Sequence, residues 1–434
     1  MKTFVKEGIM RFFTLLVAFL SFHFLTLGQQ DCRSVEYRQA LLSSHPGLAG
    51  RMQEIEAFTQ HQLHTSSVAV TGIDHGQGPR DQQVITIPVI VHIIYSSTTQ
   101  NISDGQILSQ IAVLNRDYGK LNADTSTIPS YYRELAADCG IRFALASIDT
   151  NGNATTGIIR KHTNAQSFSY DDAIKFTSRG GDNAWDRDRY LNLWVGNLSN
   201  GVLGYSSAPG CPKETDGVVI HYTAFGTCGT AAVPFNLGRT ATHEIGHWFN
   251  LIHVWGDAAC GDDRVGDTPQ QGAATRGNPQ GMIFSCGNTP YGNLYMDFMD
   301  FTDDIGMHMF TYGQRDRMRT LFDEGGFRAP LLRSNAAPQG AVPPEPSPVG
   351  ASNKGGELLS VYPNPAIDMV QVVTNGPVPF GSQLEIYDQR GQKIMMTPVV
   401  QNSFPLNISS LPMGLYFIRV RGAGKNTPSK LVKM

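Results

Sequence analysis

Residues at the spacing of a zinc site lie in one short segment of the sequence. His243 and His247 are four residues apart, Glu244 lies between them, and His253 follows six residues after His247. Histidines four residues apart lie on one face of a helix, where both imidazoles can bind one Zn²⁺. Glu244 then projects beside the open coordination position, where it can act as a general base. The pattern predicts a zinc site that activates water for hydrolysis.

The third histidine must come from beyond the helix that carries the first two. For His253 to reach the same metal, the helix must end near residue 250 in a left-handed turn, which asparagine adopts more readily than most residues, so Asn250 is a suitable occupant. The competing interpretation is an ordinary amphipathic helix with surface histidines. Its core face would then consist of Ile245, Trp248, Phe249 and Ile252.

An α+β domain over residues 81–333 is expected to position this segment. The β-branched run from Val84 to Tyr95 predicts a buried strand at its start, and further strands are predicted at 142–148 and 190–195. Ser103 and Gln106 have the spacing of a capping box, which predicts a helix that begins after Ser103.

Segments on both sides of this domain have other compositions. Residues 1–28 combine three early basic residues with an apolar run, which is typical of a secretory signal peptide and too short for a membrane anchor. Residues 29–80 are polar and helix-leaning, and we interpret them as a removable pro-segment. A Pro- and Gly-rich linker is predicted at 334–356. Short alternating strands at 357–434 predict a small all-β sandwich.

Composition excludes several classes of protein. The 434 residues carry a formal net charge of -3, so no overall positive field attracts nucleic acid. Hydrophobic residues make up 41% of the chain, which excludes wholesale disorder. No stretch after residue 28 is apolar enough to predict a membrane span.

The cysteines are expected to pair, because disulfides persist in exported proteins. The count of six allows about 15 connectivities. Cys32 lies in the pro-segment, and Cys139 is its one obvious partner. A Cys32–Cys139 disulfide is one interpretation. The other is a latency switch, in which the Cys32 thiolate occupies the open zinc position until the pro-segment is cleaved.

A chain of motifs between residues 87 and 322 resembles the pappalysin (cytophagalysin) family of zinc metallopeptidases. The segments that carry this resemblance are 190–195, 216–219, 238–247, 255–257, 265–269 and 307–311 with Gln314. The resemblance implies a metzincin-like catalytic domain, in which a twisted sheet and an active-site helix hold one catalytic zinc. Peptide-bond hydrolysis is the implied activity, with proteins or peptides as substrates.

The same resemblance implies roles for residues after the helix. A tight turn carrying methionine lies beneath the metal ligands in this family, and its motif falls on Met299 rather than Met296. The family's next tyrosine falls on Phe301, which has no hydroxyl to donate to a substrate carbonyl. Family members that cut before Arg or Lys carry an acidic residue where we align Ile305. We therefore expect an apolar pocket and cleavage before apolar residues. The alternative is that a small backbone shift at Gly306 turns the nearby Asp303 or Asp304 into the pocket.

Cysteine and calcium sites are implied in the same way. Family members link the positions of Cys260 and Cys286 by a disulfide. Cys211 and Cys228 are additional, flank one predicted strand, and are expected to pair with each other. The alternative is two free buried thiols, which an exported protein seldom keeps. Calcium is also implied, and an acidic loop with Asp257, Asp262, Asp263 and Asp267 would suit it, although a solvated surface loop explains these residues equally well.

The tail resembles the C-terminal sorting domain of type IX secretion. The resemblance is carried by 361–365, 384–388, 411–420 and 430–433. It implies export through the periplasm, a secretion machinery as partner, and an extracellular or cell-surface location. A generic adhesive β-sandwich is the alternative.

Together these features predict a secreted zinc endopeptidase with Glu244 as general base. The alternative is a non-catalytic surface-binding protein that keeps a metalloprotease fold, an interpretation motivated by Phe301. Retention of Glu244 favours the enzyme, because a binding module does not need a general base.

Overall fold

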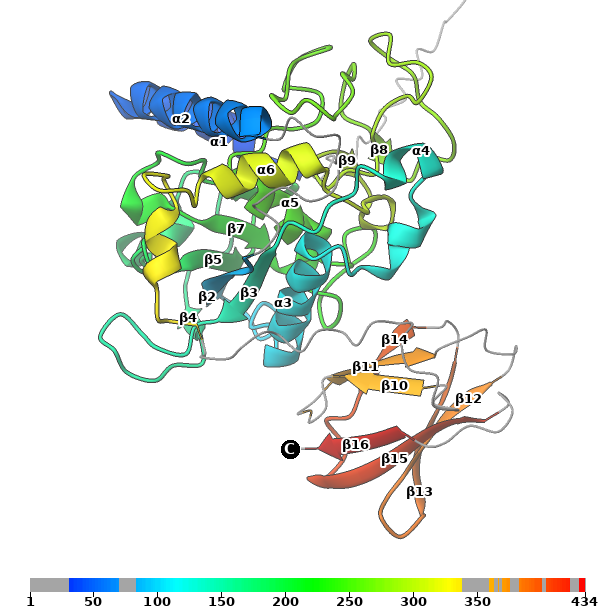
Figure 1. Cartoon of the computed structure of the whole chain (residues 1–434). Helices are drawn as coiled ribbons and strands as arrows, with labels where there is room; N and C mark the ends of the chain where they lie inside the picture. The colour runs from blue at the N-terminus through cyan, green and yellow to red at the C-terminus, as the bar shows by residue number, and fades with distance from the viewer. Residues whose placement is uncertain are drawn as a thin grey trace, which may run out of the picture.

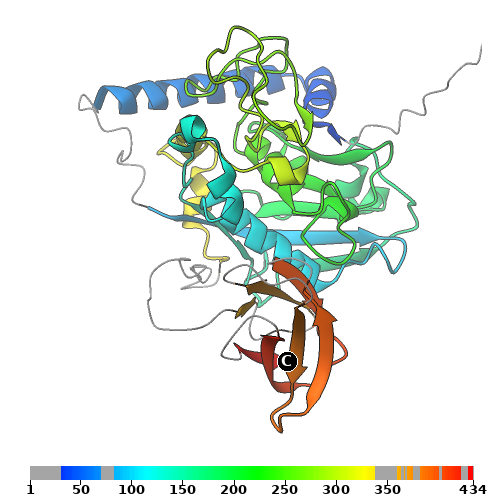
Figure 2. The ribbon, with the colours of Figure 1, turned by 90° about the vertical axis from the view of Figure 1, so that its right-hand side faces the viewer.

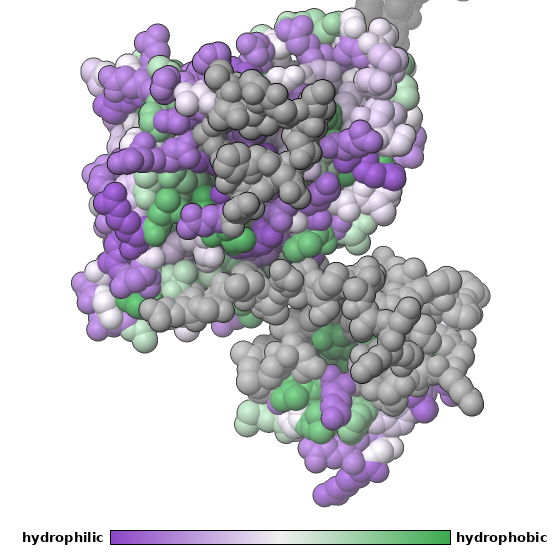
Figure 3. All heavy atoms as spheres, viewed as in Figure 1, coloured by the Kyte–Doolittle hydropathy of each residue, from purple (hydrophilic) through white to green (hydrophobic). Residues whose placement is uncertain are grey.

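The computed structural model describes residues 31–69, 83–337, 359–362, 366, 369–374, 382–399, 403–421 and 429–433. The predicted signal peptide and most of the predicted linker lie outside the described residues. Figure 1 shows the whole chain, with the C-terminal strands drawn as a body apart from the larger N-terminal part. The surface seen in Figure 3 is mostly hydrophilic, with small hydrophobic patches.

A mixed seven-stranded sheet forms the centre of the N-terminal part. Its order is β1-β6-β7-β5-β2-β3, and β4 also pairs with β2. Strands β2, β3, β4, β5 and β7 run parallel, whereas β6 is antiparallel to β7. The strands are β1 (Asp31–Cys32), β2 (Ile85–Tyr95), β3 (Ile141–Leu145), β4 (Ile158–His162), β5 (Leu191–Gly196), β6 (Val202–Ser206) and β7 (Val218–His221). The predicted strands at 84–95, 142–148 and 190–195 are confirmed as β2, β3 and β5.

Each face of this sheet is covered by different elements. Successive side chains of a strand point to opposite faces, and in β5 Leu193 and Val195 join one buried cluster while Trp194 joins another. The first cluster contains apolar residues of helices α3 (Asp104–Tyr118) and α5 (Arg239–Trp248). The second contains Tyr37 and Leu41 of α1 (Ser34–Ser44). The predicted pro-segment therefore contributes to the packed core.

The remaining helices are α2 (Leu48–Ala69), α4 (Ser130–Arg133) and α6 (Tyr312–Thr320). Figures 1 and 2 show α2 lying across the top of the sheet, and it contacts α6. At the start of α3, Ser103 Oγ accepts a hydrogen bond from Gln106 N at 3.2 Å. The reciprocal half of the predicted capping box is absent, because Gln106 Oε1 accepts instead from Thr230 N at 3.1 Å.

The C-terminal part contains two antiparallel sheets. One consists of β10 (Leu359–Tyr362), β11 (Met369–Thr374) and β14 (Ser403–Asn407). The other consists of β12 (Gln383–Tyr387), β13 (Lys393–Pro398), β15 (Gly414–Arg421) and β16 (Ser429–Lys433). Buried residues of both sheets form one apolar cluster, so the strands pack as a small sandwich. Among the described residues, no helix has the length and hydropathy needed to cross a membrane.

Candidate metal centre

Helix α5 ends early enough for His253 to return to the two helical histidines. Trp248 is its last residue, and Asn250 adopts a positive φ of 72°. This left-handed residue reverses the chain, and Leu251 N donates to Gly246 O at 2.9 Å, which satisfies one carbonyl at the helix end. The chain then returns toward the helix and brings His253 to the two helical histidines.

The three histidines converge on one point. His247 Nε2 lies 3.2 Å from His243 Nε2 and 3.0 Å from His253 Nε2. Three nitrogens bound to one tetrahedral Zn²⁺ at 2.0–2.1 Å are separated by roughly 3.3 Å. The spacing therefore fits a shared zinc ion, and all three side chains are buried.

Hydrogen bonds at the opposite ring nitrogens set the tautomers. His243 Nδ1 lies 2.6 Å from Phe298 O, and His247 Nδ1 lies 2.9 Å from Leu251 O. A carbonyl oxygen can only accept, so each Nδ1 carries the proton and each Nε2 keeps its lone pair for a metal. Burial lowers the pKa of His247 to about 3 and that of His253 to about 4, so both rings are neutral at pH 7.

Asp257 orients the third ligand. Its Oδ1 lies 2.5 Å from His253 Nδ1, and Trp255 stacks on the His253 ring with centroids 4.3 Å apart. Burial acts to raise the pKa of Asp257, but the hydrogen bond with His253 outweighs it and holds that pKa well below its usual range. Sequence reasoning assigned Asp257 to a calcium loop. Its position four residues after His253 was the signal that could have indicated this supporting role.

Glu244 is enclosed beside the ligands. Burial raises its pKa to about 7. Its Oε2 accepts a hydrogen bond from Ser34 Oγ at 2.7 Å, whereas Oε1 is buried without a hydrogen-bond partner. A Cβ atom at Gly204 of β6 would lie 2.9 Å from Glu244 Cγ, so only glycine leaves room for this carboxylate. No local sequence pattern indicates this role of Gly204, because the contact is made across the fold.

Met299 lies against helix α5. It is fully buried, and a Cβ atom at Gly246 would lie only 2.4 Å from its sulfur. Met296 belongs to a different buried cluster, with Leu294 and Met309. Phe301 lies beside the ligands, with its ring centroid 4.8 Å from that of His253.

The predicted pro-segment covers the centre. Cys32 and the three histidines each offer one ligand atom, and these atoms all lie within 4.8 Å of one another. Burial raises the pKa of the Cys32 thiol well above its usual value. Strand β1 pairs in parallel with β6, and Arg38 Nη2 donates to Asp257 Oδ2 at 2.9 Å. Cys139 is a free, buried thiol in the main core, so the alternative Cys32–Cys139 disulfide is not formed.

Ile305, which was predicted to line the specificity pocket, does not line the pocket beside His243 and Glu244. Ile305 is 59% exposed. A pocket beside His243 and Glu244 is lined instead by Asp304, with Thr240, Asp300 and Thr302. The turn over 304–306 directs the Asp304 side chain inward and the next residue outward. Burial raises the pKa of Asp304 to about 7, and its Oδ1 is buried without a hydrogen-bond partner.

One of the two expected disulfides is formed. Cys260 and Cys286 are joined, with Cα atoms 5.6 Å apart. The expected Cys211–Cys228 pairing is wrong, because both are free thiols. Cys211 precedes the four-residue strand β7 and Cys228 follows it. The two ends of this strand are roughly 10 Å apart. Cys211 joins the cluster around Tyr37, whereas Cys228 lies 3.9 Å from Ser109 Oγ of α3.

The four aspartates of the proposed calcium loop do not gather. Within the described ranges, Cys32 and the three histidines form the only group of three or more candidate ligands. Asp263 accepts from Thr268 Oγ1, and Asp267 accepts from Thr311 Oγ1 and Gly313 N. Asp262 caps the backbone N–H of Arg264.

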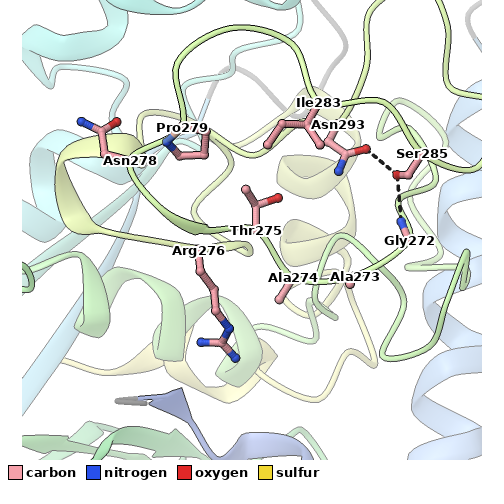
Figure 4. Close-up of a pocket in the computed structure, with 10 residues that line it drawn as sticks. All are labelled: Gly272, Ala273, Ala274, Thr275, Arg276, Asn278, Pro279, Ile283, Ser285 and Asn293. Carbon is pink, nitrogen blue, oxygen red and sulfur yellow. Dashed lines mark hydrogen bonds between the residues drawn. The ribbon is translucent and has the colours of Figure 1, made fainter. Parts of the chain in front are cut away.

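A second, open cavity of about 630 Å³ lies in the loop between residues 272 and 293. Figure 4 shows Ser285 bridging Gly272 and Asn293, and Arg276 extending away from the rest of the lining. The Arg276 guanidinium lies 5.1 Å from the centroid of the Phe301 ring. No predicted catalytic residue lines this cavity.

Two family models match the chain. Residues 177–323 match the peptidase family described as pregnancy-associated plasma protein-A, and residues 360–434 match the secretion system C-terminal sorting domain. An extracellular metalloprotease of Pyricularia oryzae is 34% identical over 258 residues, which cover 57% of this chain and 78% of that protein. One from Arthroderma otae is 31% identical over 254 residues, covering 56% and 80%.

Solved structures agree with these matches. Mature mirolysin of Tannerella forsythia, in complex with a cleaved peptide, is 47% identical with a TM-score of 0.57, covering 58% of this chain and 97% of that one. A mutant of T. forsythia promirolysin is 41% identical with a TM-score of 0.62, covering 69% and 96%. Fold and relatives together define a secreted metalloprotease with a sorting domain. The chain belongs to the pappalysin family, which confirms the predicted resemblance and fold class.

Proposed function

We propose that the chain is a zinc endopeptidase that is made as a latent zymogen. The observation that carries this proposal is the convergence of three Nε2 atoms, at 3.0 and 3.2 Å, beside the carboxylate of Glu244. His243, His247 and His253 would hold the zinc. When bound, zinc polarises a water molecule and the scissile carbonyl.

The protein's own groups handle the proton. Glu244 accepts a proton from the attacking water and returns it to the leaving amine. With the pro-segment in place, burial raises the pKa of this carboxyl group to about 7. A non-catalytic surface-binding protein has no use for a general base. The presence of Glu244 therefore favours the endopeptidase over that alternative.

Several contacts support latency through the pro-segment, for which we propose residues 29–80. Cys32 Sγ would take the fourth zinc position, and the Ser34 hydroxyl donates a hydrogen bond to the carboxylate of the general base, Glu244. Strand β1 occupies the edge of β6, where an extended substrate would add to the sheet. Removal of the segment would free all three positions at once.

The proposed boundaries of the other parts follow the sequence. We assign residues 1–28 to a signal peptide, 81–333 to the peptidase, 334–356 to the linker and 357–434 to the sorting domain, which engages the secretion machinery. Export would run through the periplasm to the cell surface or the medium.

Specificity is proposed to favour basic side chains after the cleaved bond. The buried Asp304 Oδ1 lacks a partner, and a lysine or arginine entering this pocket would supply one. An apolar side chain would leave the oxygen unpaired.

Casein or gelatin cleavage by the activated protein tests the proposed function. We expect cleavage to stop when a zinc chelator is added and to return when zinc is restored. Cleavage that continues in chelator, by protein shown to contain no zinc, would contradict the proposal.

A further inference from the structure

Tyr37 of α1 is inserted into a pocket of the peptidase part, and only 2% of its surface is exposed. Its hydroxyl donates to Asp172 Oδ2 at 2.9 Å and accepts from Lys175 Nζ at 3.1 Å. The Lys175 ammonium also lies 4.7 Å from the centroid of the Tyr37 ring. The other side of the pocket is formed by Tyr205, whose ring centroid is 4.8 Å from that of Tyr37. The pocket thus offers a hydrogen-bond donor, a hydrogen-bond acceptor and an aromatic surface, which together match a phenol.

The polar groups of this pocket are held without help from Tyr37. Lys175, which is fully buried, donates to Thr215 O at 2.8 Å and to Ser207 Oγ at 3.2 Å. Its Nζ also lies 2.9 Å from Asp172 Oδ1. These partners belong to the peptidase part, so removal of the pro-segment leaves the ammonium fixed in place. Removal of the pro-segment would therefore uncover a preformed site that contains the Lys175 ammonium, the Asp172 carboxylate and the aromatic ring of Tyr205.

The site is continuous with the edge of the sheet that borders the metal centre. Ser206 is the last residue of β6, its N–H donates to Ser34 Oγ, and Ser207 is the next residue. The pro-segment passes along β6 from Cys32, opposite Gly204, and Tyr37 enters the pocket one helical turn after Arg33. A polypeptide that pairs with β6 across the metal centre therefore passes close to this pocket.

We propose that this pocket is a tyrosine-recognition subsite of the mature peptidase, which binds a tyrosine of a polypeptide substrate a few residues from the cleaved bond. In the zymogen Tyr37 occupies it as a stand-in for that substrate residue. The proposal deepens the proposed function and rests on it, because it requires that the pro-segment leaves.

The pocket discriminates against phenylalanine. A bound phenol pairs both with the ammonium of Lys175 and with the carboxylate of Asp172. Phenylalanine would leave Asp172 Oδ2 buried without that partner and remove one acceptor from Lys175. A site built around a substrate hydroxyl rejects the analogue that lacks it, and we expect a preference for tyrosine of roughly 10- to 100-fold.

Direct binding tests the pocket without relying on catalysis. The full chain is activated by proteolytic removal of the pro-segment, and fluorescence polarisation follows a labelled synthetic peptide of residues 33–45, which lacks Cys32. We expect this peptide to bind roughly 10- to 100-fold more tightly than the same peptide carrying Tyr37→Phe. Lys175→Met in the protein should reduce the difference to about twofold. The matched control is Lys213→Met, which changes a 57% exposed side chain and should leave the preference intact.

Equal affinity of the two peptides for the unmodified protein would overturn the proposal. Because the comparison of the two peptides uses the unmodified protein, it tests the pocket even if Lys175→Met does not fold. Cleavage of a proteome-derived peptide library then tests the substrate role: tyrosine enriched over phenylalanine at one position near the cut supports it, and no such enrichment refutes it. A protein that cleaves nothing contradicts the proposed function, whereas the peptide-binding comparison still reports on the pocket.

Discussion

Glu56 of α2 anchors the proposed pro-segment to the peptidase, and its removal should accelerate activation. Its two carboxylate oxygens accept from Arg317 Nη1 at 2.9 Å and Arg317 Nη2 at 2.5 Å, and Oε2 lies 3.1 Å from Arg264 Nη1. The Arg317 side chain is only 1% exposed. Glu56→Gln keeps the size of the side chain but removes the charge that compensates this buried guanidinium.

The size of the effect follows from the pKa of Glu56. Burial opposes its ionisation, but the hydrogen bonds from Arg317 outweigh burial and lower the pKa from 4.5 to about 2. A shift of 2.5 units corresponds to about 3.4 kcal/mol. Because 17% of the Glu56 side chain remains exposed, solvent screening reduces this figure, and we take about 1 to 2 kcal/mol. Undocking of α2 should then be about 5- to 30-fold more frequent in Glu56→Gln.

Hydrogen exchange of residues 48–65 in the full-length zymogen measures undocking, and the rate of pro-segment removal by trace protease measures its consequence. The matched control is Glu54→Gln on the exposed face of the same helix. A depressed pKa contributes stability above pH 4.5 and loses it as the pH falls toward 2, so the advantage of the unmodified protein should disappear over that range. Equal exchange in Glu56→Gln and Glu54→Gln at pH 7 would refute the reasoning.

Five other variants test the proposed site. Glu244→Gln should abolish peptidase activity while zinc analysis still finds about one ion per chain, whereas His253→Ala should lose the zinc. Phe301→Tyr should raise kcat more than it changes KM, because the added hydroxyl acts on charge that develops in the transition state; an unchanged kcat would count against that role. Asp304→Asn should reduce the preference for Arg or Lys after the cut by roughly tenfold in a peptide-library profile, and a profile without a basic preference in the unmodified protein would disprove the pocket assignment. Cys32→Ser should give a zymogen that loses its pro-segment faster under trace protease, because one of the three contacts that block the centre is weakened, and a Cys32–Cys139 crosslink in mass mapping would exclude the switch.

Local rules account for the parts of the fold and site that the sequence predicts well. Strands β2, β3 and β5 follow from runs of β-branched and apolar residues, and their predicted limits differ from the observed ones by a few residues at most. The left-handed conformation at Asn250 was predicted because the helix had to stop between His247 and His253. The predicted capping box at Ser103 was only half correct, because the Gln106 side-chain oxygen accepts a hydrogen bond from Thr230 N instead of from Ser103 N.

The sequence by itself determined which side chains can share a metal, because the i, i+4 spacing of His243 and His247 and the short return to His253 are local geometry. It did not determine whether Asp304 or Ile305 faces the pocket, since one residue of difference in a tight turn reverses the direction of a side chain. The partner of Glu56 and the pocket around Tyr37 join residues more than a hundred positions apart. Only the tertiary structure decided these contacts, because packing across the fold sets them and no local pattern encodes them.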